Sequence, residues 1–171
     1  YGIGLDNIDV RTATELGMLV TNVPDFCLDE VADHTLALLL ACARRICDFD
    51  RQTGHGEWNL QTGRSMERVR GQTLGLLGYG NIGRRVAKRA MAFGLGVLVY
   101  TPRISKEHVE PPIRATRDLA QLLRESDYVS LHLPLTAETR YLLGTSELKQ
   151  MQPSAFLINT SRGEIVDEAS L

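Results

Sequence analysis

Short apolar runs alternate with longer amphipathic segments along the 171 residues of the chain. Apolar runs bounded by Gly, Pro, Asn or Asp predict strands, and apolar residues spaced by three or four predict helices. Strands are expected at residues 17–21, 74–77, 96–100, 128–131 and 155–159. Helices are expected at residues 31–47, 81–93, 118–123 and 146–151. This alternation predicts the α/β class with a mainly parallel sheet and helices on both faces.

The helix expected at residues 31–47 is apolar on all sides in its middle, residues 35–43. Such a helix is buried between layers or between two domains. The polar stretch 48–70 contains three glycines and is expected to be mostly loop, with Trp58 as its anchor in the core. The proline-containing stretch 102–116 is expected to be a surface connection.

The strand expected at 74–77 runs into Gly78-Tyr79-Gly80-Asn81-Ile82-Gly83 and then into a helix. This is the G-x-G-x-x-G dinucleotide-binding fingerprint between a strand and a helix, the context that it requires. Gly78 permits the sharp turn, Gly80 lets a pyrophosphate approach the backbone, and Gly83 lets the helix pack closely on the strand. The fingerprint predicts a Rossmann-type, doubly wound sheet with phosphates at the helix N-terminus. The alternative is a glycine-rich turn without a ligand.

The end of the next strand bears on which cofactor binds. The fingerprint expects Asp or Glu about 20 residues after the glycines, to bind the ribose 2′-OH of NAD. This chain has Thr101, followed by Pro102 and Arg103. A hydroxyl and a guanidinium can bind a 2′-phosphate, which a carboxylate would repel. We therefore expect Thr101 and Arg103 to favour NADP(H), with NAD(H) as the alternative cofactor if Arg103 is only a solvent-exposed loop charge.

The composition of the chain bears on whether it binds nucleic acid, a membrane or a metal ion. The formal net charge of −2 and the pI near 6.1 give no reason to expect nucleic acid or a membrane surface. No apolar run is long enough to span a bilayer. Three cysteines without a C-x-x-C pair suit a reducing, cytoplasmic compartment, and four scattered histidines predict no metal site. The chain starts without Met or a signal peptide, which suggests a fragment or a processed product.

Small, polar or flexible residues follow four of the expected strands. They are residues 78–83, 101–103, 132–136 and 159–163. In open α/β sheets ligands bind outside the carboxyl ends of the strands, so these segments are expected to line one crevice.

Five motifs run in order along nearly the whole chain. They are Gly2-Ile3-Gly4-Leu5-Asp6-Asn7-Ile8-Asp9, Asn22-Val23-Pro24, the glycines at 78–83, His132-Leu133-Pro134-Leu135-Thr136 and Asn159-Thr160-Ser161-Arg162-Gly163-Glu164-Ile165-Val166-Asp167-Glu168. Together they resemble the D-isomer-specific 2-hydroxyacid dehydrogenase family. The resemblance implies a flavodoxin-like substrate domain and a Rossmann domain, with residues 1–21 as the end of the former and its linker strand. Residues 22–171 would form the dinucleotide-binding domain, truncated at its C-terminal side.

The resemblance also implies roles for individual residues. Ile3 and Gly4 match the loop whose backbone holds the substrate carboxylate, and Arg162 matches the catalytic arginine, which also binds substrate. The cofactor residues implied beside the glycines are Asn81 and Ile82 on the pyrophosphate, Leu133, Pro134 and Thr139 beside the riboses and adenine, and Thr160 and Ser161 beside the nicotinamide ribose.

The chemistry of a 2-keto acid supports the assignment of Arg162 independently. A planar guanidinium can bind the carboxylate bidentately and stabilise the alkoxide-like charge that grows as hydride arrives. The alternative is a surface arginine that caps a strand end. His132 is expected to be structural, because the resemblance places the catalytic His, and the Glu that pairs with it, well downstream of Arg162.

The leading hypothesis is an oxidoreductase that interconverts a 2-keto acid and a D-2-hydroxy acid, of the glyoxylate/hydroxypyruvate reductase or phosphoglycerate dehydrogenase kind. This fragment is expected to bind cofactor but to be inactive alone. A homodimer is expected, because in the family the apolar helix lies near the dimer interface. The alternatives are an NAD(H)-binding transcriptional corepressor of the C-terminal-binding-protein type and a bare nucleotide-binding regulatory domain.

Overall fold

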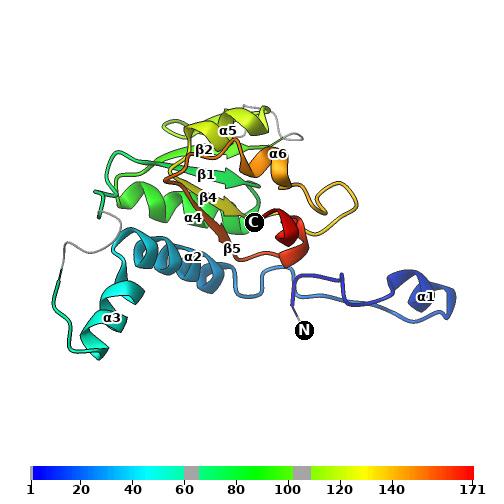
Figure 1. Ribbon diagram of the computed structural model, residues 1–171. Coiled ribbons are helices and arrows are strands. Elements are labelled where there is room, and N and C mark those ends of the chain that lie inside the picture. Colours follow the sequence, from blue (N-terminus) through cyan, green and yellow to red (C-terminus); the bar gives the residue numbers. More distant parts are fainter. Residues whose placement is uncertain (1, 60–65, 102–108) are drawn as a thin grey trace.

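The computed structural model describes residues 2–59, 66–101 and 109–171 of the chain. At its centre lies a sheet whose strands are ordered β3-β2-β1-β4-β5 (Figure 1). The strands are β1 (Thr73–Leu77), β2 (Gly96–Tyr100), β3 (Arg114–Thr116), β4 (Tyr128–Leu131) and β5 (Phe156–Asn159). All neighbouring pairs are parallel, with Leu76 of β1 opposite both Val99 of β2 and Ser130 of β4.

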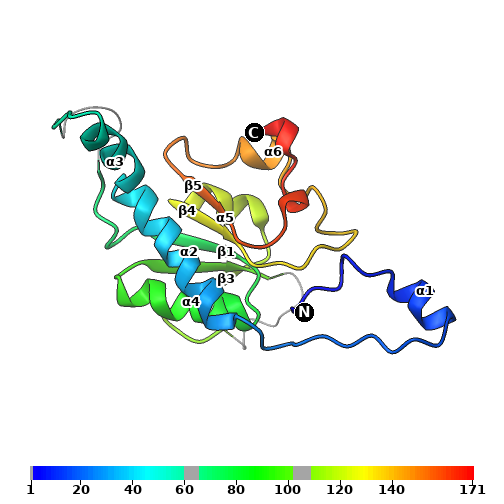
Figure 2. The same cartoon turned by 90° about the horizontal axis from the view of Figure 1, so that it is seen from below.

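Helices cover both faces of this sheet. One face carries α2 (Leu28–Ala43) and α4 (Asn81–Ala92), and the other carries α5 (Leu119–Glu125) and α6 (Thr145–Leu148), as Figures 1 and 2 show. Two further helices, α1 (Val10–Glu15) and α3 (Ile46–Gly54), project from the body, and the 3-10 turns η2 (Gly163–Ile165) and η3 (Glu168–Ser170) follow β5. The predicted Rossmann-type, doubly wound α/β fold is confirmed.

Each strand contributes to two separate cores because successive side chains point to opposite faces of a sheet. In β2, Val97 and Val99 pack with α2 and α4, whereas Leu98 packs with α5 on the opposite face. Both faces are covered, which explains why these strands are continuously apolar instead of alternating with polar residues. In β1, Gly75 leaves room for Leu122 of α5, since a β-carbon at position 75 would lie 2.7 Å from a Leu122 methyl carbon.

The strand order fixes where a ligand can bind. After β1 the chain adds β2 and β3 on one side, and it then crosses to add β4 and β5 on the other side. The connections that leave β1 and β4 therefore diverge, and they open a crevice at the carboxyl ends of these two strands. The glycine turn at residues 78–83 lies at this point of the sheet.

The N-terminal segment differs from the prediction. Residues 17–21 form no strand; together with α1 they belong to an arm that extends away from the body (Figure 1). Leu19 is 90% exposed, and Leu16 and Met18 are also exposed. A strand needs a hydrogen-bonding neighbour, and the described part of the chain places none beside this segment.

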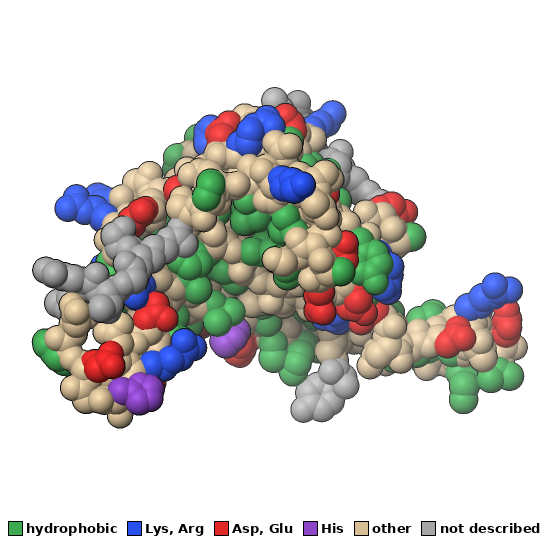
Figure 3. Space-filling model, in the orientation of Figure 1, with side chains coloured by type: hydrophobic (Ala, Val, Ile, Leu, Met, Phe, Trp, Pro, Cys, Tyr) green, Lys and Arg blue, Asp and Glu red, His purple; other side chains and the backbone are tan. Residues whose placement is uncertain are grey.

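The prediction of one helix over residues 31–47 is also wrong in its extent. It is divided at Arg45, whose φ of 52° ends α2 and allows α3 to leave in another direction. The sheet buries one side of α2, including Leu36 and Leu39, while Leu38 is exposed, so this helix is not covered all round. Figure 3 shows hydrophobic side chains on the surface below the body and on the projecting arm.

Two further expectations about the loops need correction. The stretch 48–70 was expected to be mostly loop, but its start belongs to α3, and Trp58 is 84% exposed and anchors no core. The expected surface connection 102–116 contains β3, which pairs with the outer side of β2. β3 does not follow from periodicity, because its three residues are too few to show a period. Among the described residues, no helix is both long and apolar enough to cross a membrane.

Candidate active site

The glycine turn is held at the carboxyl ends of three strands. Gly78 has a φ of +102° and donates its N–H to the Tyr100 carbonyl at 3.3 Å, and the His132 N–H donates to the Leu77 carbonyl at 2.8 Å. A β-carbon at position 78 would lie 2.5 Å from the carbonyl oxygen of His132. At position 83 it would collide with the carbonyl of Gly78. Only glycine therefore fits at these two positions.

Gly80 differs from these two glycines because its backbone faces open space. A β-carbon there would meet no atom within 4 Å. α4 starts at the next residue, its first backbone bond runs from the Arg84 N–H to the Gly80 carbonyl, and its first turn has no acidic residue. The N–H groups of Asn81, Ile82 and Gly83 therefore have no acceptor within the helix. Open space beside unpaired donors at a positive helix end fits a pyrophosphate.

The turn after β4 lies beside the glycine turn. A β-carbon on Gly78 would lie 3.1 Å from a methyl carbon of Leu133, so Leu133 closes this side of the crevice. Thr139 shapes the rest of the turn, because its hydroxyl donates to the Pro134 carbonyl at 2.6 Å and accepts from the Thr136 N–H at 2.7 Å. Thr139 thus fixes the shape of the turn as well as lying on the predicted cofactor wall.

Thr101 lies at the end of β2, where the fingerprint expects a carboxylate. Its N–H donates to the Thr116 carbonyl at 3.2 Å, and only 6% of the residue is exposed. Its hydroxyl makes no hydrogen bond within the part of the chain that the structure describes. Arg103, the second residue predicted to favour NADP(H), lies outside the described residues.

Hydrogen bonds hold the loop after β5 in one shape. The Asn159 side chain donates to the Arg162 carbonyl at 2.8 Å and accepts from the Ser161 N–H at 2.9 Å. The Ser161 hydroxyl donates to the Leu131 carbonyl of β4 at 2.6 Å. The Thr160 hydroxyl lies 3.1 Å from that of the buried Thr35 on α2. These bonds fix the backbone from which Arg162 projects.

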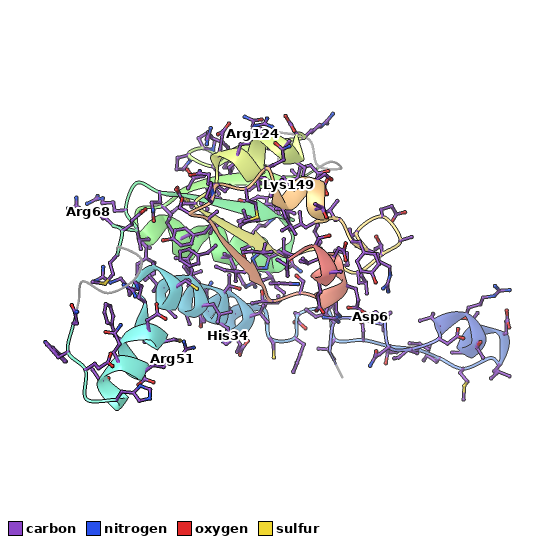
Figure 4. All side chains as sticks on the ribbon, in the orientation of Figure 1. Asp6, His34, Arg51, Arg68, Arg124 and Lys149 are labelled. Carbon is purple, nitrogen blue, oxygen red and sulfur yellow. The ribbon has the colours of Figure 1, made fainter. Side chains whose placement is uncertain are left out.

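The guanidinium of Arg162 reaches the N-terminal segment. Its Nε donates to Oδ2 of Asp6 at 2.8 Å, its Nη2 donates to Oδ1 at 2.9 Å, and its Nη1 donates to the Ser161 carbonyl at 3.1 Å. This bidentate hydrogen bond lowers the pKa of Asp6 and raises that of Arg162. Both groups are therefore charged at neutral pH. Figure 4 shows Asp6 where the arm meets the body.

The loop of Ile3 and Gly4 lies against the same guanidinium. A β-carbon on Gly4 would collide with Nη2 of Arg162 and lie 2.6 Å from Oδ1 of Asp6. The Asn22 amide donates to the Ile3 carbonyl at 2.9 Å and holds the loop in place. The N–H groups of Ile3 and Gly4 donate to no group among the residues described. The structure thus brings the three predicted substrate residues together.

His132 is partly buried beside the glycine turn. Its Nε2 lies 2.9 Å from the Ser130 hydroxyl, and burial lowers the pKa of His132 to about 4. A neutral imidazole held by a neighbouring hydroxyl agrees with the structural role expected for it.

Three residues that contribute to this site were missed by the sequence reasoning. They are Asp6, Asn22 and Thr35, which hold Arg162, Ile3 and Thr160 respectively. Asp6 and Asn22 belong to motifs noted above, so their position in those motifs was an available signal. Their partners lie far away in the chain and could not be identified from spacing.

An open groove of about 510 Å³ lies between α2 and the end of β5. Thr160 borders it together with His34 and Leu38. Thr160 therefore faces this groove and α2, and no hydrogen bond joins it to the glycine turn within residues 2–59, 66–101 and 109–171. Over the same ranges, no three His, Cys, Asp or Glu side chains are placed to hold a metal ion.

Comparison with known proteins shows to which family this chain belongs. Residues 36–171 match the model of the "D-isomer specific 2-hydroxyacid dehydrogenase, NAD binding domain". The chain belongs to the D-isomer-specific 2-hydroxyacid dehydrogenase family. The resemblance drawn from the five motifs is confirmed, and the matched region is a pyridine-nucleotide-binding unit.

One curated relative is a glyoxylate reductase of Aeropyrum pernix, 49% identical over 177 residues that cover 99% of this chain and 52% of the relative. Among solved structures, a D-lactate dehydrogenase of Aquifex aeolicus complexed with NAD and lactic acid matches with a TM-score of 0.90 and 33% identity, covering 99% of this chain and 50% of that one. An acyclic imino acid reductase in complex with NADPH and D-arginine matches with a TM-score of 0.87 and 33% identity, covering 99% and 54%.

The chain thus spans about half the length of the relatives and structures that it matches. The division between residues 1–21 and 22–171 stays a prediction, as do the roles of the individual site residues.

Proposed function

We propose that this chain supplies the cofactor-binding half of an oxidoreductase that interconverts a 2-keto acid and a D-2-hydroxy acid. The observation that carries this proposal is the contact between the Arg162 guanidinium and the Ile3–Gly4 loop. It places a fixed cation and two unused backbone N–H groups together, next to the loop after β5. A carboxylate adjacent to a reacting carbonyl is the group that such a set of donors binds best.

Different residues of this chain bind the cofactor and the substrate. The nicotinamide cofactor, when bound, supplies or accepts the hydride. Gly78, Gly80 and the start of α4 bind its pyrophosphate, with Leu133, Pro134, Thr139, Thr160 and Ser161 along its riboses and rings. The N–H groups of Ile3 and Gly4 bind the substrate carboxylate. Arg162 orients the 2-keto acid and stabilises the negative charge that develops on its carbonyl oxygen during reduction.

The substrate class that we propose is a small 2-keto acid of the glyoxylate or hydroxypyruvate kind, with a phosphoglycerate-type substrate as the second candidate. The name of the Aeropyrum pernix relative, a glyoxylate reductase, favours the first. The relatives reported above are named as enzymes, so the corepressor alternative draws no support from them.

The test is Arg162→Ala in the complete enzyme that contains this segment. Removing a donor that stabilises developing charge lowers kcat by about 100-fold or more. Cofactor affinity, measured by the fluorescence of bound NADPH or NADH, should change less than about twofold, because the glycine turn and α4 remain. Turnover of glyoxylate or hydroxypyruvate within threefold of the parent enzyme would refute the role of Arg162.

We further propose a preference for NADP(H). The position where a carboxylate would select NAD holds Thr101, whose hydroxyl makes no hydrogen bond among residues 2–59, 66–101 and 109–171, and a solved structure similar to this chain carries NADPH. In Thr101→Asp, like-charge repulsion should lower kcat/KM for NADPH by about tenfold and spare NADH. Thr101→Val, which removes the hydroxyl without adding charge, is the matched control. A parent enzyme that clearly prefers NADH would contradict the proposal.

The remaining proposals concern assembly and location. A homodimer would cover the exposed side of α2, where Leu38 reaches the surface, and Phe26 just before this helix. The three cysteines stand unpaired, which suits a cytoplasmic location. Sedimentation of the complete enzyme tests the first, because a monomer at micromolar concentration would exclude a stable dimer.

A further inference from the structure

Arg162 has five N–H donors, and three of them already have acceptors. Asp6 takes Nε–H and one N–H of Nη2, and the Ser161 carbonyl takes one N–H of Nη1. Within the part of the chain that the structure describes, one N–H on each terminal nitrogen therefore has no acceptor. Because Asp6 occupies the side of the fork that contains Nε, the remaining Nη2 hydrogen points away from Asp6, along the outer end of the guanidinium.

The Gly4 backbone lies against this terminal part of the guanidinium. A β-carbon on Gly4 would collide with Nη2, so the backbone passes as close as a residue without a side chain allows. The unused N–H groups of Ile3 and Gly4 are in the same short loop. The orientation of the guanidinium therefore determines whether the outer N–H groups of Arg162 and the backbone N–H groups of Ile3 and Gly4 can bind the same anion.

Arginine side chains have several rotatable bonds, and an arginine with no partner would populate many orientations. The Asp6 carboxylate removes this freedom, because two parallel hydrogen bonds define the plane of the guanidinium as well as its position. It also offsets the charge of Arg162. Substrate binding then depends on how the free N–H groups are arranged as well as on the positive charge of Arg162.

We propose that Asp6 is a positioning residue for Arg162. It holds the guanidinium side-on and leaves the outer N–H groups aligned for the carboxylate and carbonyl oxygens of a 2-keto acid. This inference rests on the proposed function. It adds a residue of the N-terminal segment, 156 positions away from Arg162, to the machinery that orients the substrate.

The experiment uses the complete enzyme and compares Asp6→Asn with Asp9→Asn. Asn keeps the size of the side chain and one acceptor but cannot accept two charge-assisted hydrogen bonds. We expect D6N to lower kcat/KM for the 2-keto acid by about 10- to 100-fold, mostly through kcat, because a misplaced catalytic group costs about that much. Cofactor affinity should change less than about twofold.

Asp9 is the matched control because it carries the same group in the same segment. Its carboxylate caps α1 through Thr12 and has no contact with Arg162. D9N should leave kcat/KM within about twofold of the parent enzyme. Thermal unfolding of every variant shows whether it is folded at the assay temperature.

A double-mutant cycle separates positioning from a purely structural role. If Asp6 acts through Arg162, Asp6→Ala should lower activity by about 10- to 100-fold in the parent and by less than about twofold in Arg162→Ala. An equal loss in both backgrounds would mean that Asp6 only attaches the N-terminal segment, and it would overturn the inference.

Two other outcomes are distinguishable. A D6N enzyme as active as the parent overturns the inference and leaves the proposed function intact. A parent enzyme that reduces no 2-keto acid overturns the proposed function, and the inference with it.

Discussion

Gly80 and Gly83 lie three residues apart in the fingerprint, but the structure requires them for different reasons. The α-carbon of Gly83 faces the Gly78 carbonyl, whereas that of Gly80 faces open space. A side chain at position 83 is therefore excluded by the protein itself, and one at position 80 only by a ligand. Single-residue substitutions can test this difference directly.

Gly80→Ala should leave the free energy of unfolding within about 0.5 kcal/mol of the parent, since surface changes of this kind are small. It should weaken NADPH binding by about tenfold or more, because the methyl group occupies the space proposed for the pyrophosphate. Gly83→Ala should lower both stability and affinity, because α4 must move. Urea unfolding and fluorescence titration measure the two effects. Unchanged cofactor affinity in G80A would place the pyrophosphate elsewhere.

The lowered pKa of His132 predicts how the stability of the folded protein depends on pH. Its pKa is about 4 in the folded protein, below the value of about 6.5 in the unfolded chain. Between these values the unfolded chain binds more protons, so stability falls as the pH drops from 6.5 towards 4. This difference between the two pKa values corresponds to a loss of about 3 kcal/mol in the free energy of unfolding.

Urea unfolding of the parent and His132→Asn at pH 7 and pH 4.5 measures this effect. The variant should lose less stability between the two pH values than the parent. His55→Asn, at an exposed position after α3, is the control and should behave as the parent does. Equal acid sensitivity of H132N and the parent would show that His132 carries no such penalty.

At the scale of elements, β1, β2 and β4 could be predicted from the sequence because each is an apolar run bounded by turn residues, and α4 because it is long enough to show its helical period. β3 could not, since Arg114, Ala115 and Thr116 form a strand only because β2 offers them an edge. The division of α2 from α3 was equally hidden. The backbone of Arg45 takes a left-handed conformation that no local residue preference signals.

The contact between α2 and the end of β5 supports a prediction at this scale. Thr35 is buried, and its hydroxyl bonds the Val31 carbonyl and the Thr160 hydroxyl. Thr35→Val keeps the shape but loses both bonds. It should lower the free energy of unfolding by about 1 kcal/mol. It should also weaken cofactor binding, because the loop carrying Thr160 and Ser161 loses a support.

Thr53→Val on α3 is the matched control. The Thr53 hydroxyl donates to the Phe49 carbonyl four residues earlier, as that of Thr35 does to Val31, but among the described residues it bonds only within α3. Thr53→Val should lower the free energy of unfolding by less than about 0.5 kcal/mol and leave cofactor binding unchanged. If both variants lose the same stability in urea unfolding, the bond between α2 and the loop after β5 contributes nothing.

At the scale of the whole molecule, the surfaces proposed to bind cofactor and substrate differ in completeness. The proposed cofactor crevice is built within one sheet, whereas the proposed substrate loop of Ile3 and Gly4 comes from the N-terminal segment, which continues into the projecting arm with α1 (Figure 1). Exposed apolar residues on that segment, such as Leu16 and Leu19, have no covering layer among the described residues. The resemblance expects the catalytic acid to be a histidine after Arg162, and this chain has no histidine beyond His132.

We therefore expect the 171-residue chain on its own to bind NADPH but to reduce no 2-keto acid. Fluorescence titration would measure NADPH binding, and the loss of NADPH absorbance in the presence of glyoxylate would measure reduction. The complete enzyme serves as the positive control. Reduction of glyoxylate by the chain alone would show that a residue present here can act as the acid.

The sequence alone determined the β1–glycine turn–α4 unit and the doubly wound sheet, because strand and helix periods and glycine positions are local properties. Its motifs also predicted that Arg162, Ile3 and Gly4 share a substrate site, and the structure brings these three residues together. Only the tertiary structure decided that Asp6 holds Arg162, that Thr35 supports Thr160 and that Trp58 is exposed. These are contacts, or missing contacts, between residues far apart in the chain. The hydrophobic pattern shows which side of an element is apolar, but the partner that meets it is fixed only when the chain is folded.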